Sequence, residues 1–268
     1  MSLSFLFDKL WQQYSIENPS VKKVYNLLTE EGEIIVNDHI AFRTFDRDVI
    51  NIDVLANEFI KSGYVKSGEY HFEEKKLFAK HFQHATDENA PRVFISQLKT
   101  KEFSPFLNEV VDRIVSQLTS EQLTSNELIY SGRLWEKPSF EVYDKLRSES
   151  EYAAWLYVNG FKANHFTVSL NHLKYFQDIY KLNAFLKISG FEMNSPENEV
   201  QGTAAELLEQ SSIKADVIQV EFADGMHDVT SCYYEFAKRY PDSDGKLFPG
   251  FIAKSADKIF ESTDLWKK

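Results

Sequence analysis

The spacing of apolar residues changes twice within the first hundred positions. Apolar side chains at helical intervals over 3–14 and over 20–30 predict two opening helices, with a turn at Asn18-Pro19 between them. From Asp38 to Phe45 the period shortens to that of a strand. One helix and three strands are then expected, over about 52–62, 64–72, 76–84 and 92–98.

This order of elements is a βαβββ unit, and the second half of the chain shows signs of another. A strand is expected over 164–170, followed by a helix over 173–189 that ends at Gly190. Two further strands are expected over 215–222 and 227–236. The polar residues between these two strands indicate a hairpin turn rather than a metal-binding loop.

Several residues of the first unit recur in the second at one constant offset. The pairs are Leu55 with Leu182, Ser62 with Ser189, Gly63 with Gly190 and Tyr64 with Phe191. His39 and His165 keep the same spacing to within one residue. Helix–glycine–strand units can resemble one another by chance, but the two histidines favour an internal duplication.

The sequence therefore predicts an α+β fold with two βαβββ modules, over about 34–100 and 162–240. Additional helices are expected at the N-terminus and in an insertion over about 103–160. A segment over 245–268 follows the second module and is expected to help form a pocket. A chain of 268 residues is long enough to bury one large core, and we expect residues 1–268 to form a single compact catalytic domain.

Alternation along the strands groups the polar residues that could carry chemistry. His39, Ala41 and Arg43 share one strand face, and small Ala41 leaves space between the two larger side chains. By the same rule, Tyr233 and Glu235 share a face. Such polar groups fill a core poorly but line a pocket well.

Two imidazoles and one carboxylate, from His39, His165 and Glu235, would hold a divalent metal on one side and leave other positions open. This is the arrangement of non-haem Fe(II) oxygenases. Taken singly, each residue is better explained as an ordinary strand residue, so the prediction depends on their joint placement in the repeat. The same donors could instead serve a Zn- or Ni-dependent hydrolase or isomerase.

The other histidines are weaker candidates. His81 and His84 lie three residues apart, so on one strand they would face opposite sides. A solvated strand is the simpler interpretation of this pair. The same interpretation is given to His71, His172 and His227.

Composition excludes several classes of function. A net charge of −11 disfavours nucleic-acid and membrane partners, and requires a local cation for any anionic substrate. Cys232 is the one cysteine, which bars an internal disulfide and suggested a reducing, cytoplasmic location. No apolar run approaches the roughly 20 residues that cross a bilayer. Phosphate loops, nucleophile elbows and zinc-protease motifs are absent from the sequence.

Four separated motifs resemble the 2-oxoadipate dioxygenase/decarboxylase family, also called hydroxyglutarate synthase, from about residue 35 to the C-terminus. They are Asp38-His39-x-Ala41-Phe42-Arg43, Asn164-His165-Phe166-Thr167, Tyr233-Tyr234-Glu235-Phe236 and Gly250-Phe251 with Ala256-Asp257-Lys258-Ile259-Phe260. The family is related to the vicinal oxygen chelate superfamily, which implies an incomplete β-barrel built from the paired modules.

The resemblance implies that His39, His165 and Glu235 bind Fe(II) and that Arg43 grips a substrate carboxylate. The implied reaction is oxidative decarboxylation of a 2-oxo diacid by dioxygen, with 2-oxoadipate giving 2-hydroxyglutarate and carbon dioxide. Further substrate contacts are expected from Tyr233, Gly250, Phe251 and Ile252, although Gly250 could simply form a turn. A non-catalytic ligand-binding relative remains the third alternative.

Overall fold

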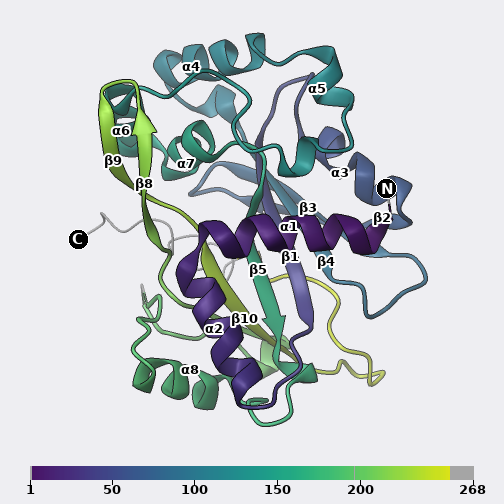
Figure 1. Cartoon of the computed structure of the whole chain (residues 1–268). Coiled ribbons are helices and arrows are strands. Elements are labelled where there is room, and N and C mark those ends of the chain that lie inside the picture. Colours follow the sequence, from purple (N-terminus) through teal and green to yellow (C-terminus); the bar gives the residue numbers. More distant parts are fainter. Residues whose placement is uncertain (1, 196, 254–268) are drawn as a thin grey trace.

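The computed structural model describes residues 2–195 and 197–253, and its centre is one mixed sheet of eight strands (Figure 1). The strand order is β2-β3-β4-β1-β5-β10-β7-β6. The first module consists of β1 (Asn37–Phe45), α3 (Ile52–Lys61), β2 (Tyr64–Phe72), β3 (Leu77–His84) and β4 (Arg92–Leu98). The second consists of β5 (Ala163–Ser169), α8 (Ile179–Ile188), β6 (Gln201–Thr203), β7 (Leu208–Ser212) and β10 (Tyr233–Arg239).

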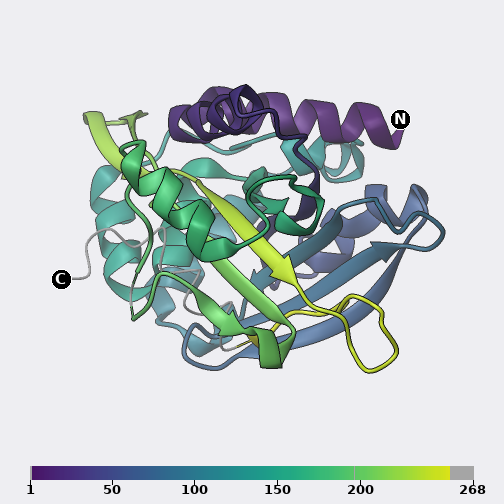
Figure 2. The same cartoon turned by 90° about the horizontal axis from the view of Figure 1, so that it is seen from below.

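The strand pairing repeats itself about the middle of the sheet. In the first module β1 pairs in parallel with β4, and in the second β5 pairs in parallel with β10. The two modules join where β1 pairs with β5 in the antiparallel sense. The internal duplication and the curled, incomplete barrel are therefore confirmed, and Figure 2 shows the curl of the sheet.

The second module differs in detail from its predicted strands. The strand expected over 215–222 is β8 (Val217–Phe222), which pairs only with β9 (Gly225–Thr230) in a separate hairpin. The run expected as one strand over 227–236 is broken before β10 begins at Tyr233. The hairpin turn was correct, but β6 and β7 were missed, because these short and largely polar strands show no apolar alternation.

The helix expected over 173–189 begins later, at Ile179. A short 3-10 turn, η3 (Leu170–His172), and an irregular segment come first. The side chain of Asp178 then accepts a hydrogen bond from the backbone N–H of Lys181 and caps α8. The apolar residues before the cap had extended the helical pattern beyond the helix itself.

Helices α1 (Leu3–Glu17) and α2 (Pro19–Glu30) lie across the middle of the sheet in Figure 1. The Trp11 ring contacts Phe166 of β5 and Tyr234 of β10, with ring centroids 5.3 and 5.9 Å apart. Residues next to these two in each strand, His165 and Tyr233, therefore face the other side of the sheet. The predicted alternation is confirmed, and it separates an aromatic core from a polar face.

The insertion between the modules is helical, as predicted. It contains α4 (Pro105–Ser116), α5 (Ser120–Thr124), α6 (Phe140–Glu149) and α7 (Glu151–Asn159), with 3-10 turns η1 (Thr100–Glu102) and η2 (Leu128–Tyr130). The second module has a further 3-10 turn besides η3, which is η4 (Ala204–Glu206). Helix α7 is buried from Tyr152 to Asn159. Within the described ranges, none of the helices has the length and apolarity needed to span a membrane.

Gly160 ends α7 and lies close to the backbone of Gly132, so a substitution there tests whether this contact stabilises the insertion. Its φ of 69° and ψ of −150° suit glycine, and an added Cβ would lie 2.2 Å from the backbone oxygen of Gly132. We expect Gly160→Ala to lower the free energy of unfolding by at least about 3 kcal/mol in urea titrations. Gly190→Ala is the matched control, because φ is also positive there but no atom lies within 4 Å. Its cost should be about 1 kcal/mol, and equal losses in the two variants would contradict this account.

Candidate metal centre

Three strands bring His39, His165 and Glu235 together on the polar face of the sheet. In the strand register Thr167 of β5 lies between His39 of β1 and Glu235 of β10, and His165 lies one pleat away on the same face. The His39 Nε2 atom is 3.4 Å from Glu235 Oε1, and the His165 Nε2 atom is 3.3 Å from Glu235 Oε2. One ligand atom from each residue lies within 4.8 Å of the others, so the group could hold a metal ion.

Each imidazole is oriented by its preceding residue. His39 Nδ1 donates to the Asp38 carboxylate at 2.8 Å, and His165 Nδ1 lies 3.1 Å from the side-chain oxygen of Asn164. With Nδ1 held in this way, each Nε2 is directed toward Glu235. Histidines that bind metals in proteins commonly have such a partner behind the ring, because it selects the tautomer and the ring orientation.

Burial controls the charge state of the cluster. It lowers the pKa of His39, despite the opposing effect of the hydrogen bond that His39 donates to Asp38, and lowers the pKa of His165 well below its usual value. Both rings are therefore neutral near pH 7 and carry a lone pair. Burial also raises the pKa of Glu235 to about 8. A divalent cation is the kind of neighbour that would favour the charged form of this carboxylate.

Two buried polar atoms beside the cluster have no hydrogen-bond partner among the described residues. They are the hydroxyl oxygen of Tyr233 and the side-chain oxygen of Gln210, whose amide nitrogen donates to Glu235 at 2.6 Å. The Tyr233 ring also stacks on His165, with centroids 4.7 Å apart. Buried polar groups are normally satisfied, so these two atoms favour a ligand in the site.

Arg43 lies on the same face of β1 as His39, and residues of helix α7 hold its side chain in place. Its side chain is 2% exposed, Nη1 is 3.1 Å from the Glu151 carboxylate, and the guanidinium lies over the rings of Tyr152 and Trp155. A cleft of about 310 Å³ reaches this arginine from the side of α6 and α7, with Lys75 on its wall. The structure therefore places a cation near the triad, already paired with an internal carboxylate.

The chain beyond β10 returns to cover the triad. The Phe251 ring packs edge-on against His39, with centroids 4.8 Å apart, and also contacts Phe94. The carbonyl oxygen of Gly250 accepts a hydrogen bond from Arg239, whereas Ile252 is only half-buried. The predicted motif over 256–260 lies outside the described residues.

His81 shows where the sequence interpretation was wrong. It was expected on a solvated strand, but its side chain is 2% exposed. Its Nδ1 is 2.8 Å from the Tyr70 hydroxyl, and its ring lies 5.4 Å from that of Phe251. His84 and His227 are also partly buried, and His227 stacks on Phe140 with centroids 3.8 Å apart. His81 follows Lys80, and Gln83 lies two residues on along the same face of β3, so the local sequence gives no signal of burial.

Two βαβββ modules with a buried polar site at their junction define a fold class, and solved structures of other proteins show the same fold. A solved glyoxalase superfamily protein from Ralstonia eutropha JMP134 has the same fold, with a TM-score of 0.74 at 21% identity over 90% of this chain and 83% of that one. A family model for 2-oxoadipate dioxygenase/decarboxylase matches residues 6–244. The chain belongs to this family, and the resemblance found in its motifs is confirmed.

Two curated plant relatives are named 2-oxoadipate dioxygenase/decarboxylase. The rice protein is 36% identical over 93% of this chain and 75% of its own length, and the Arabidopsis thaliana protein is 35% identical over 93% and 74%. This chain is accordingly an enzyme of the dioxygenase/decarboxylase type. The match to the family model begins earlier than residue 35 and ends before Gly250, so the motif that starts at Gly250 lies outside the matched residues.

Solved structures extend the likeness. Hydroxyglutarate synthase from Oryza sativa in complex with 2-oxoadipate has a TM-score of 0.91 and 33% identity, over 97% of this chain and 91% of that one. A protein from Shewanella frigidimarina NCIMB 400 has a TM-score of 0.88 and 47% identity, over 93% and 97%.

The expectation of a cytoplasmic protein is wrong by the same comparisons. The rice relative is named as chloroplastic/amyloplastic and the Arabidopsis relative as chloroplastic. A single cysteine excludes an internal disulfide, but it does not distinguish one reducing compartment from another. Cys232 is therefore no evidence for the cytoplasm over another reducing compartment.

Stability at low pH should report the burial of His81. Burial, with smaller effects of Arg92 and Arg239, lowers the pKa of His81 to about 4 from 6.5, so the unfolded chain binds the extra proton first. This contribution is fully present above pH 6.5 and is lost as the pH falls toward 4. Between pH 7 and 4.5 the wild type should lose about 2 kcal/mol more unfolding free energy than His81→Gln. Parallel pH curves from urea titrations would show that His81 does not titrate in this way.

Proposed function

We propose that this chain is an Fe(II)-dependent dioxygenase that converts 2-oxoadipate and dioxygen to 2-hydroxyglutarate and carbon dioxide. The reaction is balanced, since carbon dioxide leaves as C1 with its two carboxylate oxygens and both atoms of dioxygen end in 2-hydroxyglutarate. The observation that carries the proposal is the convergence of two neutral imidazoles and a carboxylate beside Arg43. Family membership and the name of the rice complex with 2-oxoadipate support this choice of reaction.

The donor set suits the proposed metal. Two histidines and one carboxylate on one side of an ion are the ligands of many non-haem Fe(II) oxygenases. His39, His165 and Glu235 would hold the ion, and Fe(II) would supply the electrons that dioxygen activation requires. Zn or Ni could bind the same atoms and activate water, but the family of this chain is named for oxidation. The metal sets the chemistry, whereas the protein sets the geometry.

Arg43 would hold the carboxylate at the far end of the substrate. A guanidinium can donate two parallel hydrogen bonds to a carboxylate, which fixes both distance and orientation. Glu151 now accepts one hydrogen bond from Arg43, so an arriving diacid would share or replace this internal partner. The aromatic rings of Tyr152 and Trp155 would keep the guanidinium in place during that exchange.

Tyr233 and the returning chain would complete the pocket. The buried Tyr233 hydroxyl, which lacks a described partner, could donate to an oxygen of the substrate. Burial raises its pKa well above the usual value, so it remains a proton donor at neutral pH. Phe251, together with Gly250 and Ile252, would exclude water and keep the product close to the oxidant after carbon dioxide leaves.

Both modules contribute to this site, which supports a single catalytic unit. His39 and Arg43 come from the first module, and His165, Tyr233 and Glu235 come from the second. The helical insertion supplies Glu151 to the same site. We therefore propose that residues 1–268 act as one catalytic domain rather than as two independent halves.

The test is turnover by protein that has been purified anaerobically and loaded with Fe(II). We expect oxygen uptake, carbon dioxide release and 2-hydroxyglutarate formation in equal amounts with 2-oxoadipate, without added 2-oxoglutarate. Zn-loaded protein should be inactive, because Zn(II) has no accessible redox change. Failure of the iron form to turn over any 2-oxo diacid of four to seven carbons would contradict the proposal.

Two variants separate the metal site from the substrate site. His39→Ala should lose tight metal binding and turnover together, since one of three ligands is removed. Arg43→Lys should keep the metal affinity but raise KM at least tenfold, because lysine lacks the planar fork. Metal titration by calorimetry alongside steady-state kinetics measures both. Loss of metal affinity in Arg43→Lys would show that this arginine shapes the metal site instead.

A further inference from the structure

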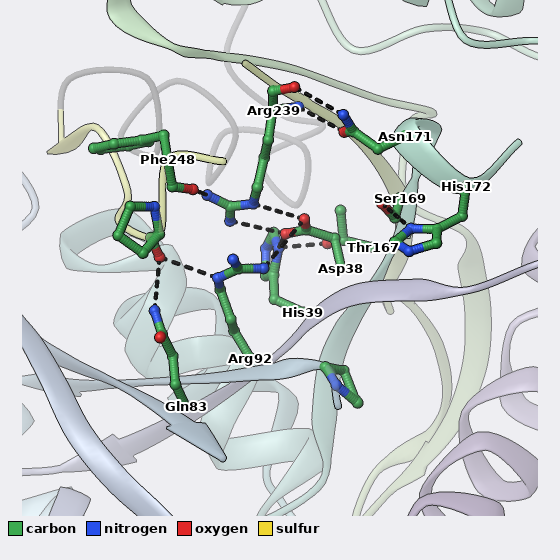
Figure 3. A network of polar contacts seen from close by, with 12 residues as sticks. Asp38, His39, Gln83, Arg92, Thr167, Ser169, Asn171, His172, Arg239 and Phe248 are labelled. Carbon is green, nitrogen blue, oxygen red and sulfur yellow. Dashed lines mark hydrogen bonds and ion pairs between the residues drawn. The ribbon is translucent and has the colours of Figure 1, made fainter. Parts of the chain in front are cut away.

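Residues 248–251 form a short strap that lies against the metal-site end of the sheet (Figure 3). The chain leaves β10 at Arg239, turns back through residues 240–247, and returns beside that arginine. Every residue of the strap from Phe248 to Phe251 contacts a polar side chain through its backbone. Phe248 and Gly250 accept from Arg239, Pro249 accepts from Arg92 and Gln83, and Phe251 donates to the Tyr70 hydroxyl.

Arg239 joins the strap to the residue behind His39. Its Nε and Nη2 atoms donate to the two oxygens of Asp38 at 2.7 and 2.9 Å. Its Nη1 atom donates to the strap carbonyls of Phe248 and Gly250 at 2.8 and 2.7 Å. Asp38 in turn accepts from His39 Nδ1 at 2.8 Å. Arg239 therefore connects the strap to a proposed metal ligand through the Asp38 carboxylate. Arg92 makes a weaker connection of the same kind, since its Nε atom donates to Pro249 at 3.0 Å and its Nη1 atom lies 3.6 Å from Asp38.

Burial and hydrogen bonds hold the Arg239 side chain in this position. Its side chain and that of Asp38 are both 2% exposed. Asn171 accepts from the backbone N–H of Arg239 and donates to its carbonyl, which fixes the start of the side chain. A buried guanidinium needs acceptors for its donors, so lifting the strap would leave Nη1 unsatisfied unless the whole group moved. Such movement would disturb Asp38.

A further contact, through an aromatic ring, joins the strap to His39. The Phe251 ring lies edge-on to the His39 ring, and the Arg239 guanidinium lies 5.2 Å from the centre of the Phe251 ring. The strap thus contacts His39 directly through an aromatic ring and indirectly through the Asp38 carboxylate. Both contacts require the strap to be docked.

We propose that Arg239 is a positioning residue that couples docking of the strap to metal binding at His39. The docked strap fixes Arg239, Arg239 fixes Asp38, and Asp38 orients the imidazole for the metal. Since such coupling is reciprocal, a bound metal must also favour the docked strap. The inference rests on the metal site of the proposed function, but Arg239 and Asp38 are not among the proposed metal ligands or substrate contacts.

Arg239→Lys is the informative variant, because it keeps the charge but loses the fork that reaches both partners. Co(II) serves as a redox-stable probe of the site. Its affinity is measured by calorimetry, and hydrogen exchange of peptides covering 248–251 is measured with and without saturating Co(II). In the wild type we expect Co(II) to slow exchange of the strap at least tenfold.

In Arg239→Lys we expect Co(II) affinity to fall at least tenfold, the range seen when groups behind metal ligands are removed. Strap exchange should then no longer respond to saturating Co(II). Gln83→Ala is the matched control, since it removes one strap bond at Pro249 but leaves Arg239 and Asp38 paired. Its strap should exchange faster, while its Co(II) affinity stays within twofold and its strap still responds to the metal.

If Arg239→Lys does not fold, the double variant Asp38→Asn with Arg239→Gln removes both charges of the Asp38–Arg239 pair together. It should show the same loss of response. Wild-type Co(II) affinity in either variant, or a metal response of the strap that persists, would overturn the proposal while leaving the proposed function intact. If the wild-type protein bound no divalent metal, both this proposal and the proposed function would be wrong.

Discussion

The pairing of β1 with β5 is the contact on which the rest of the site depends. It joins the two modules in the antiparallel sense and places His39 opposite Thr167, and Ala41 opposite His165. The two histidines are therefore diagonal neighbours on one face, at a spacing that lets their rings converge. A shift of one residue would turn one of them to the opposite face, toward the helices. The buried face of each strand makes such a shift costly.

Around this junction the protein buries a set of charges that balance one another. The pKa of Asp38 stays well below its usual value, because Arg239 and the hydrogen bond to His39 outweigh the opposing effect of burial. For Glu235, by contrast, burial outweighs the lowering effects of the Gln210 hydrogen bond and of Arg239, and its pKa rises to about 8. The first carboxylate is thus a built-in structural anion, whereas the second is suited to share its charge with a ligand. This difference separates a residue that orients from one that binds.

Much of this site could be predicted from sequence, because its logic is local. The periodicity of two along β1, β5 and β10 groups His39, His165 and Glu235 with Arg43 and Tyr233, and the repeat relates the two histidines. Those relations need no knowledge of distant contacts. The first module was predicted nearly to the residue for the same reason, since its strands are seven to nine residues long and show their period.

The parts that escaped prediction depend on contacts between distant segments. Strands β6 and β7 are short and polar, and they are strands only because β7 pairs with β10 and β6 pairs with β7. His81 is buried because Phe251 returns from the C-terminal side to cover it. Glu151 lies far from Arg43 in the chain, and Arg239 resembles any basic residue at the end of a strand. No periodicity marks such partners.

We propose that His39, His165 and Glu235 together bind one iron ion. The most direct measurement is anomalous diffraction, on both sides of the iron absorption edge, from crystals grown anaerobically with Fe(II). We expect one strong iron peak within bonding distance of the Nε2 atoms of His39 and His165 and of the Glu235 carboxylate. An iron peak elsewhere, or none between these three side chains at full loading, would contradict it.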